Sequence, residues 1–534
     1  MPYQGTEVAI PMGQQGLKTD DAATNLPPTV LIDVRNVSIY NNLVEKERGS
    51  AKYNATPLTD GILGLYDWYP TSNVQRLIAV TADGKIWRDT GDGTFSSSTP
   101  ITTGLGSPTN DSTKLVAGGQ ETAGNNRKLF IFTGTAQVQV LSGDATSTTS
   151  IALPAADWSS IYPTFGVLHR NRLFAFGNSN DPHRVYASDD DNHEKFDTGD
   201  ILTYSVFPGE GDGIRSAIVY KGRLFVFKNP TGVYYLEDAD TDPANWYFKK
   251  LTNSFGVAGA HSLVQVMDDL LAGNSSGTVT SLQAVQAFGD LKQGDIMSNA
   301  QVENFYRSNT SPGGYQFMNA LYYEEKKQAY FTYRNQAIDN QNRLVIVDIA
   351  RQTPRFLFGD KDQISTLALR KDSLGINRPI YGNEAGFVFS MDQETKNVGG
   401  DGYNGSFQTP HMDMSFVNPQ LANKNKLFDF LTLVYEPTGS WSVDVEVYVD
   451  GIRKQTLNYK MMKGNGLDEF ILDVDTLGGT EPEDLRKPLS GCYGRRISFL
   501  VKNINADEDF RIEQLIVGFR VSDERQNALT EGSN

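Results

Sequence analysis

The 534-residue chain has one cysteine, Cys492, so it can form no internal disulfide and no zinc site built on several cysteines. It has no run of 18 apolar residues, which argues against a membrane-spanning helix. Basic residues are also scarce, because 48 Lys and Arg stand against 64 Asp and Glu for a net charge of −16. This balance argues against a protein whose task is to grip nucleic-acid phosphates, since that binding relies on Lys and Arg.

Long amphipathic helical patterns are missing as well. Short apolar or alternating runs bounded by Gly, Asn, Asp and Pro dominate, and the chain has 50 glycines and 11% aromatic residues. The clearest run is 443–449, in which valines alternate with other residues before the turn pair Asp450-Gly451. The sequence therefore predicts an all-β fold whose strands are joined by tight turns.

A weak internal repeat consists of an apolar strand, a polar turn and a second apolar strand. Its first strands begin 44 to 60 residues apart, a period that suits a four-stranded β-propeller blade. The seven predicted strand pairs are 76–80 with 86–87, 128–132 with 138–140, 172–176 with 185–186, 223–227 with 233–235, 269–272 with 279–282, 329–332 with 344–347, and 379–381 with 387–389. Because no Trp-Asp or kelch signature occurs, the alternative is a β-sandwich or several small β domains with similar hairpins.

The repeat and a composition change after Met391 give the expected domains. We predict an irregular six- or seven-bladed β-propeller over 60–396, with an N-terminal extension and strand, 1–59, packed on it. Residues 397–405 are rich in glycine and predict a linker or long loop. Beyond it, an antiparallel β-sandwich-like domain is expected over 406–522, and the polar residues 523–534 are expected to form a disordered tail. The predicted strands of this domain are 430–435, 443–449, 455–459, 469–474, 497–502 and 511–521.

One motif matches a catalytic pattern. Residues 273–277 (Gly-Asn-Ser-Ser-Gly) fit G-x-S-x-G, in which a hydrolase serine lies on a turn from a strand into a helix. Another strand is predicted directly after Ser275, so we interpret the motif as a hairpin turn within a blade.

Two acidic stretches are candidates for cation binding. Residues 238–242 (Asp-Ala-Asp-Thr-Asp) begin like a calcium loop, but Pro243 and Lys249 stand where an EF-hand needs Gly and Glu. A solvated turn is therefore expected, with a weak calcium site as the alternative. The second stretch is expected to be a solvated loop, with a cation site or a glycosidase pair left open. It comprises Asp189, Asp190, Asp191, Glu194, Asp197 and Asp200.

The remaining candidates give no support for catalysis. The five histidines form no H-x-x-x-H or H-E-x-x-H pair. They are His169, His183, His193, His261 and His411. Residues 209–213 (Gly-Glu-Gly-Asp-Gly) lack the lysine of a P-loop and are interpreted as a connection between blades. The sequence thus predicts no catalytic, cofactor-binding or metal-binding residues, and a protein that is not an enzyme.

Several segments resemble bacteriophage tail proteins. Residues 16–21 (Gly-Leu-Lys-Thr-Asp-Asp), 26–28 (Leu-Pro-Pro) and 33–37 (Asp-Val-Arg-Asn-Val) are similar to an opening that precedes a propeller in those proteins. Segments similar to their recurrent blades are 168–177 with 184–189, 214–227, and 254–264 with 268–279. Residues 271–274 depart from the family, whose members often carry a bulkier aromatic strand end there. The resemblance covers about residues 14 to 290, and later parts match only in order.

The family is the tail nozzle, or tail hub, of short-tailed phages. The resemblance implies a structural virion protein of the phage tail, assembled in the bacterial cytoplasm, that forms a ring, commonly a homohexamer. Such a ring extends the DNA channel below the head-to-tail adaptor, retains the genome and guides its ejection. The implied partners are the adaptor and tail fibre, spike or needle proteins, with viral DNA passing through the channel without specific binding. Acidic side chains facing that channel would repel phosphates.

Two other functions stay open. A propeller-based adhesin or receptor-binding module would recognise host surface glycans or partner proteins on its loops. Trp68, Trp158 and Trp441 would favour it if they were exposed together at a rim. A glycan depolymerase using acids from propeller loops is the enzymatic alternative, but no residue spacing supports it.

Overall fold

A computed structural model describes most of the chain. The described residues are 5–40, 43–91, 93–95, 99–119, 127–151, 153, 158, 161–190, 192–196, 202–210, 213–283, 294–311, 313–337, 342–350, 354–462 and 483–521. They form an all-β protein made of many small antiparallel sheets, as the sequence predicts. The short helices α4 (Ile296–Asn299) and α5 (Glu303–Asn309) lie between the fifth and sixth of the sheets described next. The predicted strand 469–474 and the expected tail 523–534 lie outside the described residues.

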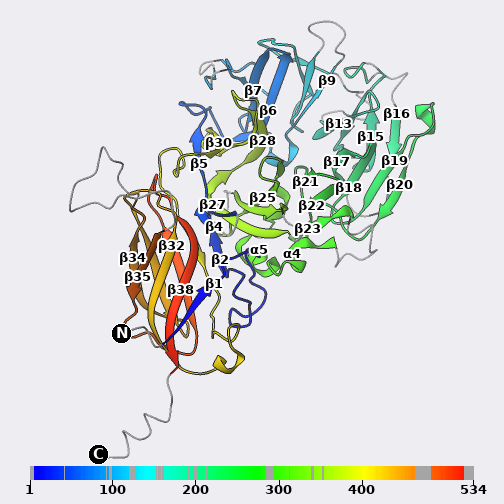
Figure 1. The fold of residues 1–534 in the computed structure, drawn as a ribbon. Helices are drawn as coiled ribbons and strands as arrows, with labels where there is room; N and C mark the ends of the chain where they lie inside the picture. Colours follow the sequence, from blue (N-terminus) through cyan, green and yellow to red (C-terminus); the bar gives the residue numbers. More distant parts are fainter. Residues whose placement is uncertain are drawn as a thin grey trace, which may run out of the picture.

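Seven small sheets follow one another along the chain (Figure 1). The first three are β6 (Ile62–Thr71), β7 (Val74–Thr81) and β8 (Lys85–Arg88); β9 (Lys114–Gly118), β10 (Lys128–Phe132), β11 (Gln139–Ser142) and β12 (Thr149–Ser150); and β13 (Phe165–His169), β14 (Arg172–Phe176), β15 (Arg184–Ala187) and β16 (Leu202–Ser205). The next two are β17 (Ile214–Tyr220), β18 (Arg223–Lys228), β19 (Val233–Glu237) and β20 (Tyr247–Thr252); and β21 (Leu263–Val266), β22 (Asp269–Gly273) and β23 (Val279–Ser281).

The last two complete the series. They are β24 (Ala320–Tyr323), β25 (Gln328–Arg334), β26 (Asn342–Asp348) and β27 (Arg355–Ile364); and β28 (Thr366–Lys371), β29 (Asn377–Gly382), β30 (Val388–Gln393) and β5 (Gly49–Lys52). The seven strand pairs predicted from the repeat are confirmed, because each is an antiparallel pair in its sheet. The seventh sheet takes its outer strand, β5, from the beginning of the chain.

The seven sheets pack against their neighbours through apolar residues. The first strand of each sheet contacts the first strand of the next, and β28 of the seventh sheet contacts β6 of the first. Apolar clusters fill the spaces between sheets; Phe130 and Phe132 of β10, for example, pack with Leu173 and Ala175 of β14. A strand covered on both faces has no polar side, which explains why β10, β14 and β18 are apolar runs rather than alternating ones.

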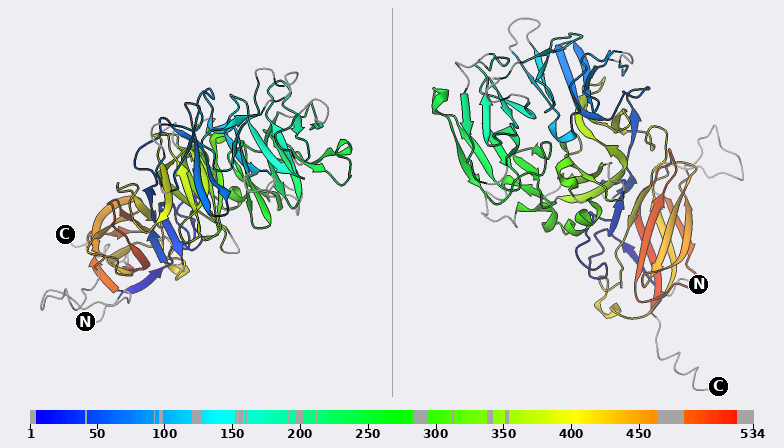
Figure 2. Two further views of the ribbon diagram at one scale, coloured as in Figure 1. Left: turned by 90° about the horizontal axis from the view of Figure 1, so that it is seen from above. Right: turned by 180° about the vertical axis from the view of Figure 1, so that it is seen from behind.

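Two further sheets form a separate unit, called here the two-sheet unit (Figures 1 and 2). One sheet has the order β3 (Val37–Tyr40), β4 (Leu43–Lys46), β38 (Arg511–Val521), β32 (Lys426–Tyr435) and β35 (Glu483–Pro488), with β1 (Thr6–Ile10) paired to β38 and β36 (Tyr493–Gly494) paired to β32. The other has the order β2 (Asp33–Arg35), β31 (Gly405–Gln408), β37 (Ile497–Asn503), β33 (Ser442–Val449) and β34 (Ile452–Lys460).

The alternation seen in the sequence determines how β33 lies in this unit. All four of its valines are buried, and Asp450 and Gly451 adopt positive φ angles of 49° and 80° in the turn to β34. These angles match the two-residue hairpin turn that an Asp-Gly pair favours. The predicted strands 430–435, 443–449, 455–459, 497–502 and 511–521 all fall within strands of this unit.

The N-terminal residues contribute to both parts of the protein. Strands β1, β2 and β4 pair with strands from the last 130 residues, whereas β5 pairs with β30 of the seventh sheet. Only Glu47 and Arg48 separate β4 from β5. We call residues 43–52 the crossing segment, because they pass directly from one part to the other (Figure 1). The glycine-rich stretch 397–405 lies against it, with Ser50 N donating to Asn397 O at 2.9 Å and Gly399 N donating to Ser50 O at 2.8 Å.

We expect residues 405–521 to fail to fold when expressed alone, because β38 and β31 would lose the strands that cover their edges. Fusion of residues 5–47 to this fragment should restore a soluble monomer. Size-exclusion chromatography and circular dichroism measure both outcomes. A monomeric fragment 405–521 with cooperative unfolding would show that the N-terminal strands are dispensable.

Candidate functional site

The crossing segment carries four consecutive charged residues, Glu45, Lys46, Glu47 and Arg48. In sequence, such a run is typical of a solvated surface. In the structure Lys46 is fully buried and Glu47 is 7% exposed. Because buried charges need partners, these residues mark the place where the two parts of the protein are held together.

Lys46 faces the two-sheet unit. Its Nζ donates hydrogen bonds to Asn503 Oδ1 at 2.9 Å and to the Asn505 carbonyl at 2.7 Å. Burial lowers the pKa of Lys46 to about 8, although the carboxylates of Asp509 and Glu508 oppose the shift. Lys396 donates to the Lys46 carbonyl at 2.5 Å and forms an ion pair with Asp509 at 3.1 Å. Lys46 is therefore bound at both its side chain and its backbone.

Glu47 faces the sixth sheet. It forms an ion pair with Lys361 Nζ at 2.8 Å, and the same ammonium lies 3.2 Å from Asp362. Burial on its own would lower the pKa of Lys361, but the carboxylates of Asp362 and Glu47 raise it above its usual value. Ser50, two residues beyond Arg48, donates to Asp362 Oδ1 at 2.7 Å. Removing one member of such a buried group leaves a charge without compensation, which typically costs about 3 to 5 kcal/mol.

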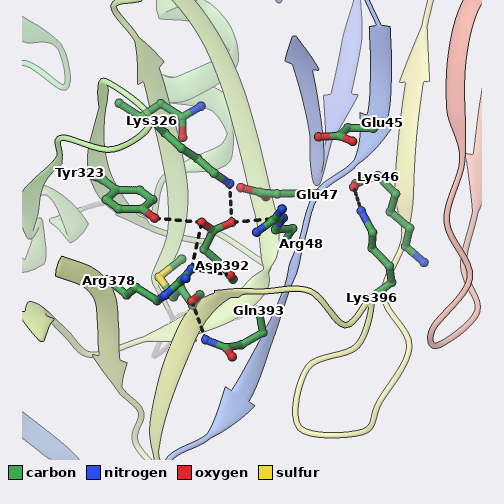
Figure 3. Close-up of polar contacts among 12 residues, drawn as sticks. Glu45, Lys46, Glu47, Arg48, Tyr323, Lys326, Arg378, Asp392, Gln393 and Lys396 are labelled. Carbon is green, nitrogen blue, oxygen red and sulfur yellow. Dashed lines mark hydrogen bonds and ion pairs between the residues drawn. The ribbon is translucent and has the colours of Figure 1, made fainter. Parts of the chain in front are cut away.

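Asp392, at the end of β30, joins three elements (Figure 3). Its carboxylate accepts a hydrogen bond from Tyr323 OH at 2.9 Å and from Lys326 Nζ at 2.5 Å. Arg378 and Arg48 lie 3.7 Å and 3.9 Å from it. The Asp392 side chain is only 7% exposed, whereas its cationic partners are 25% to 44% exposed. One buried carboxylate thus ties the crossing segment to the sixth and seventh sheets.

A cavity of about 580 Å³ opens beside this cluster. Its walls come from the sixth and seventh sheets and from β3 and the crossing segment, and they include Tyr40, Arg48, Lys326, Arg378 and Asp392. Arg355, which also lines the cavity, is 4% exposed and donates from Nε to Asp348 at 2.7 Å. The chemistry of the cavity is charge pairing, which positions three elements relative to one another rather than activating a nucleophile.

We expect Asp392→Asn to lower the free energy of unfolding by about 2 kcal/mol, because Tyr323 and Lys326 lose a charged acceptor. Chemical denaturation measures the change. Glu303→Gln is the matched control, since it removes a carboxylate from the surface pair with Arg307, and such pairs contribute less than about 1 kcal/mol. Equal effects of the two substitutions would contradict a special role of the Asp392 cluster.

Residues of the opening motif have defined structural contacts on the sixth sheet. Gly16 has a φ of +74°, and a Cβ there would lie 2.9 Å from the Phe356 carbonyl. Asp20 accepts hydrogen bonds from the backbone N–H groups of Glu303 and Asn304 at the start of α5. Asn36 also has positive φ, and its Oδ1 accepts from Asp360 N at 2.8 Å. These residues fasten the N-terminal segment to β27 and α5.

The G-x-S-x-G motif lies between β22 and β23, as the sequence predicts. Asn274 organises the turn, because its Oδ1 accepts from Ser276 N at 3.0 Å and from Thr278 N at 3.2 Å. Gly277 supplies a φ of +80°. The strand-to-helix turn that a hydrolase needs is not formed by these described residues.

Ser275→Ala should therefore leave the fold and the function unchanged, whereas Asn274→Ala should destabilise the turn because it removes five hydrogen bonds of one side chain. Thermal unfolding and an esterase assay with an activated ester test the pair. Loss of a measured esterase activity in Ser275→Ala, with folding preserved, would overturn the structural interpretation of the motif.

The acids of the stretch 238–242 take part in local contacts. Asp238 accepts from His169 Nε2 at 2.6 Å and from Arg170 Nε at 2.9 Å. Burial on its own would raise the pKa of Asp238, but these two hydrogen bonds lower it. Asp242 accepts from Ala244 N at 3.0 Å and caps the short helix η2 (Pro243–Asn245). Within the described part of the chain, no group of three or more His, Cys, Asp and Glu residues is placed to hold a metal ion.

The other acidic stretch and the histidines are dispersed. Asp189 forms an ion pair with Lys195 at 3.5 Å and Glu194 with Lys128, while Asp191, Asp197 and Asp200 lie outside the described residues. His183 Nδ1 contacts Lys228 Nζ at 3.0 Å, whereas His193 Nδ1 accepts from Gly119 N at 3.0 Å. His183 and His193 therefore do not form a common site. His411 donates its backbone N–H to Ala23, and the backbone carbonyl of His261 accepts from Ala320 N.

The glycine-rich segment 207–213 and the three tryptophans proposed for a rim make contacts within the protein. Within 207–213, the carbonyls of Phe207 and Glu210 accept from Lys228 Nζ, and residues 211 and 212 are outside the described part. Trp68 is 3% and Trp158 is 4% exposed, and Trp441 is half-buried. The described residues contain no helix long and apolar enough to cross a membrane.

Comparisons with known proteins name no relative. No protein-family model matches the chain, and no curated protein is significantly similar to it. Among solved structures, the crystal structure of the computationally designed Ika8 protein matches with a TM-score of 0.37 and 13% sequence identity, covering 64% of this chain and 99% of that chain. A similarity at that level supports no statement about fold or function.

Sequence reasoning missed the charged cluster of the crossing segment. The run Glu45 to Arg48 has the composition of a solvated surface, and its partners Lys361 and Asp392 are more than 300 residues away. The sequence offers no clear signal for this cluster, because Glu47 and Arg48 lie in the two-residue connection between β4 and β5 and their partners are distant in sequence.

Proposed function

We propose that the chain is a structural subunit of the tail of a short-tailed phage. In this proposal, copies of the chain form the nozzle or hub ring that extends the DNA channel below the adaptor. The ring retains the genome and guides its ejection. The observation that carries the proposal is the crossing segment, whose buried charges fix two all-β parts to each other. A fixed orientation between two rigid parts is what the subunit of a rigid ring requires.

The arrangement of the seven sheets supports a seven-bladed β-propeller as one of these parts. Each first strand contacts the next in a continuous cycle from β6 to β28, and β28 contacts β6 again. The strand β5 from the N-terminal residues completes the seventh sheet, a connection that joins the two ends of such a cycle. Both sheets of the two-sheet unit contribute to one apolar core, which continues into the fifth, sixth and seventh sheets, and this unit is the proposed sandwich domain.

The residues behind the tail-protein resemblance support the same reading. The similar segments 168–177 and 214–227 form the hairpins β13–β14 and β17–β18, each closed by a two-residue turn with positive φ. Those turns are Arg170-Asn171 and Lys221-Gly222. Gly16, Asp20 and Asn36 of the opening motif each hold a contact that attaches the N-terminal segment. The resembling residues are thus ones that shape and join the blades.

The adhesin alternative loses its main support. Two of the three tryptophans proposed for a rim, Trp68 and Trp158, are buried. The net charge of −16 fits a channel wall that DNA slides past, since acidic side chains repel phosphates.

Electron cryomicroscopy of virions that contain this protein tests the proposal. We expect a closed ring on the tail axis, below the adaptor. Recombinant protein mixed with its adaptor should give the same contact, and it should bind duplex DNA weakly at physiological salt. A peripheral position on the particle would favour the adhesin, and tight salt-sensitive binding to duplex DNA would contradict a passive channel wall.

A further inference from the structure

One end of the two-sheet unit exposes large apolar side chains. This end, called the tip, is formed by residues 411–429, 449–455, 490–496 and 520–521, where β32 begins and β33 and β38 end. It lies away from the seven sheets (Figures 1 and 2). The exposed apolar residues of the tip are Phe416 (41%), Val417 (47%), Leu427 (36%), Ile452 (62%), Tyr493 (44%) and Val521 (40%). They are half of all the large apolar residues that the described chain exposes.

Hydrogen bonds hold the segments of the tip together. Leu427 lies opposite Tyr493 on one side and Arg520 on the other, so the three side chains form a row across three strands. The buried Lys426 donates from Nζ to the carbonyls of Leu421 and Arg495 at 2.9 Å and 3.2 Å. Asp450 accepts from the backbone N–H of Arg495 and so attaches the turn before Ile452. These hydrogen bonds therefore fix the segments that carry the exposed apolar residues.

The tip is basic, in contrast to the chain as a whole. Its residues include seven Lys and Arg and three Asp, which gives a charge of +4. Lys424, Arg453, Lys454, Arg495 and Arg520 are exposed on it. Exposed apolar side chains among charged residues mark an interaction surface, and the basic charge of the tip selects an acidic partner.

The chain itself contains a segment of complementary composition. Residues 463–482 contain five acids and one lysine, a charge of −4, with six large apolar residues among them. Those apolar residues are Leu467, Phe470, Ile471, Leu472, Val474 and Leu477. The acids and apolar residues alternate in short groups, which matches a surface that is both basic and apolar.

The ends of this segment are fixed away from the tip. β34 begins at the tip with Ile452 and ends at Lys460, and β35 begins with Glu483 opposite Tyr435, at the other end of β32. At about 3.3 Å per residue, the nine residues of β34 separate the two ends by about 30 Å. To reach its own tip and return, the 20-residue segment would need almost full extension. The segment of a neighbouring copy can contact the tip without being extended in this way.

We propose that the tip of one copy binds the acidic, apolar segment 463–482 of the next copy. The inference rests on the proposed function, because it names the contact through which ring subunits join. It is a heterologous, head-to-tail contact, in which each copy offers a tip to one neighbour and a segment to the other. Such contacts close into a ring when the rotation between copies permits it.

Single-site variants of the full chain test the tip. Ile452→Ser should shift the assembled protein to monomers in mass photometry and analytical ultracentrifugation. Leu374→Ser is the control, since Leu374 is 78% exposed in a turn of the seventh sheet, away from the tip. Assembly that survives Ile452→Ser, or that is lost equally in Leu374→Ser, would overturn the proposal.

Charge reversal tests the pairing. Lys454→Glu with Arg495→Glu on the tip, or Asp468→Lys with Asp473→Lys on the segment, should each give monomers. A mixture of the two variants should assemble with alternating copies, because the unaltered tip meets the unaltered segment and the reversed tip meets the reversed segment. Combining all four changes in one chain should restore assembly. Monomers in both the mixture and the combined variant would refute the pairing of tip and segment.

Failure of the tip contact can be distinguished from failure of the proposed tail function. If the variants assemble like the unaltered protein, the tip contact is wrong, while the ring on the tail axis is still judged by imaging the particle. If the particle has no ring of this protein, the tail function fails irrespective of the variants.

Discussion

The fold depends on one short stretch of chain that belongs to two sheets at once. β4 and β5 are separated by two residues, and those residues and their neighbours carry charges that are buried in different places. Lys46 is held by the two-sheet unit, Glu47 by Lys361 of the sixth sheet, and Arg48 lies beside Asp392 of the seventh. A buried ion that loses its partner is costly, so any rotation between the two parts separates charges that need each other. Apolar packing is less directional, and on its own it would tolerate sliding.

The sequence predicts the central strand pairs of the seven small sheets well. Runs such as 128–132 and 223–227 are apolar on both faces and bounded by turn residues, so their local pattern is enough. Pairings between distant residues are different. Nothing near Thr6 indicates that β1 lies beside β38, because a five-residue strand with a mixed burial pattern fits many partners. The sequence places residues 1–59 as an extension on the propeller. In the structure β1 to β4 belong to the two-sheet unit and β5 to the seventh sheet, while Gly16 and Asp20 contact β27 and α5.

The sequence does not predict the charged cluster of the candidate site, for a related reason. Charged residues in sequence indicate solvent, and only the fold reveals that Lys46 and Lys361 lie among carboxylates and carbonyls. Asp392 likewise has no motif around it, and its partners come from three separate elements. The motifs that do resemble chemistry, such as 273–277 and 238–242, have compositions that also build tight turns. In both cases hydrogen bonds of Asn274 and Asp242 to nearby backbone N–H groups give the local reason for those residues.

The pairing of the first strands with the last has a consequence for how the protein is made. β1 leaves the ribosome about 500 residues before β38, the strand it pairs with. At roughly 5 to 20 residues per second, synthesis of the intervening chain takes on the order of 25 to 100 s. During that time β1 and β2 have no permanent partners, β4 has only β3 beside it, and β5 lacks its partner β30. The two-sheet unit can therefore form only after β38 has been synthesised, so copies of the protein cannot join through this unit before that point. The fold thus delays any assembly through the two-sheet unit until β38 has left the ribosome.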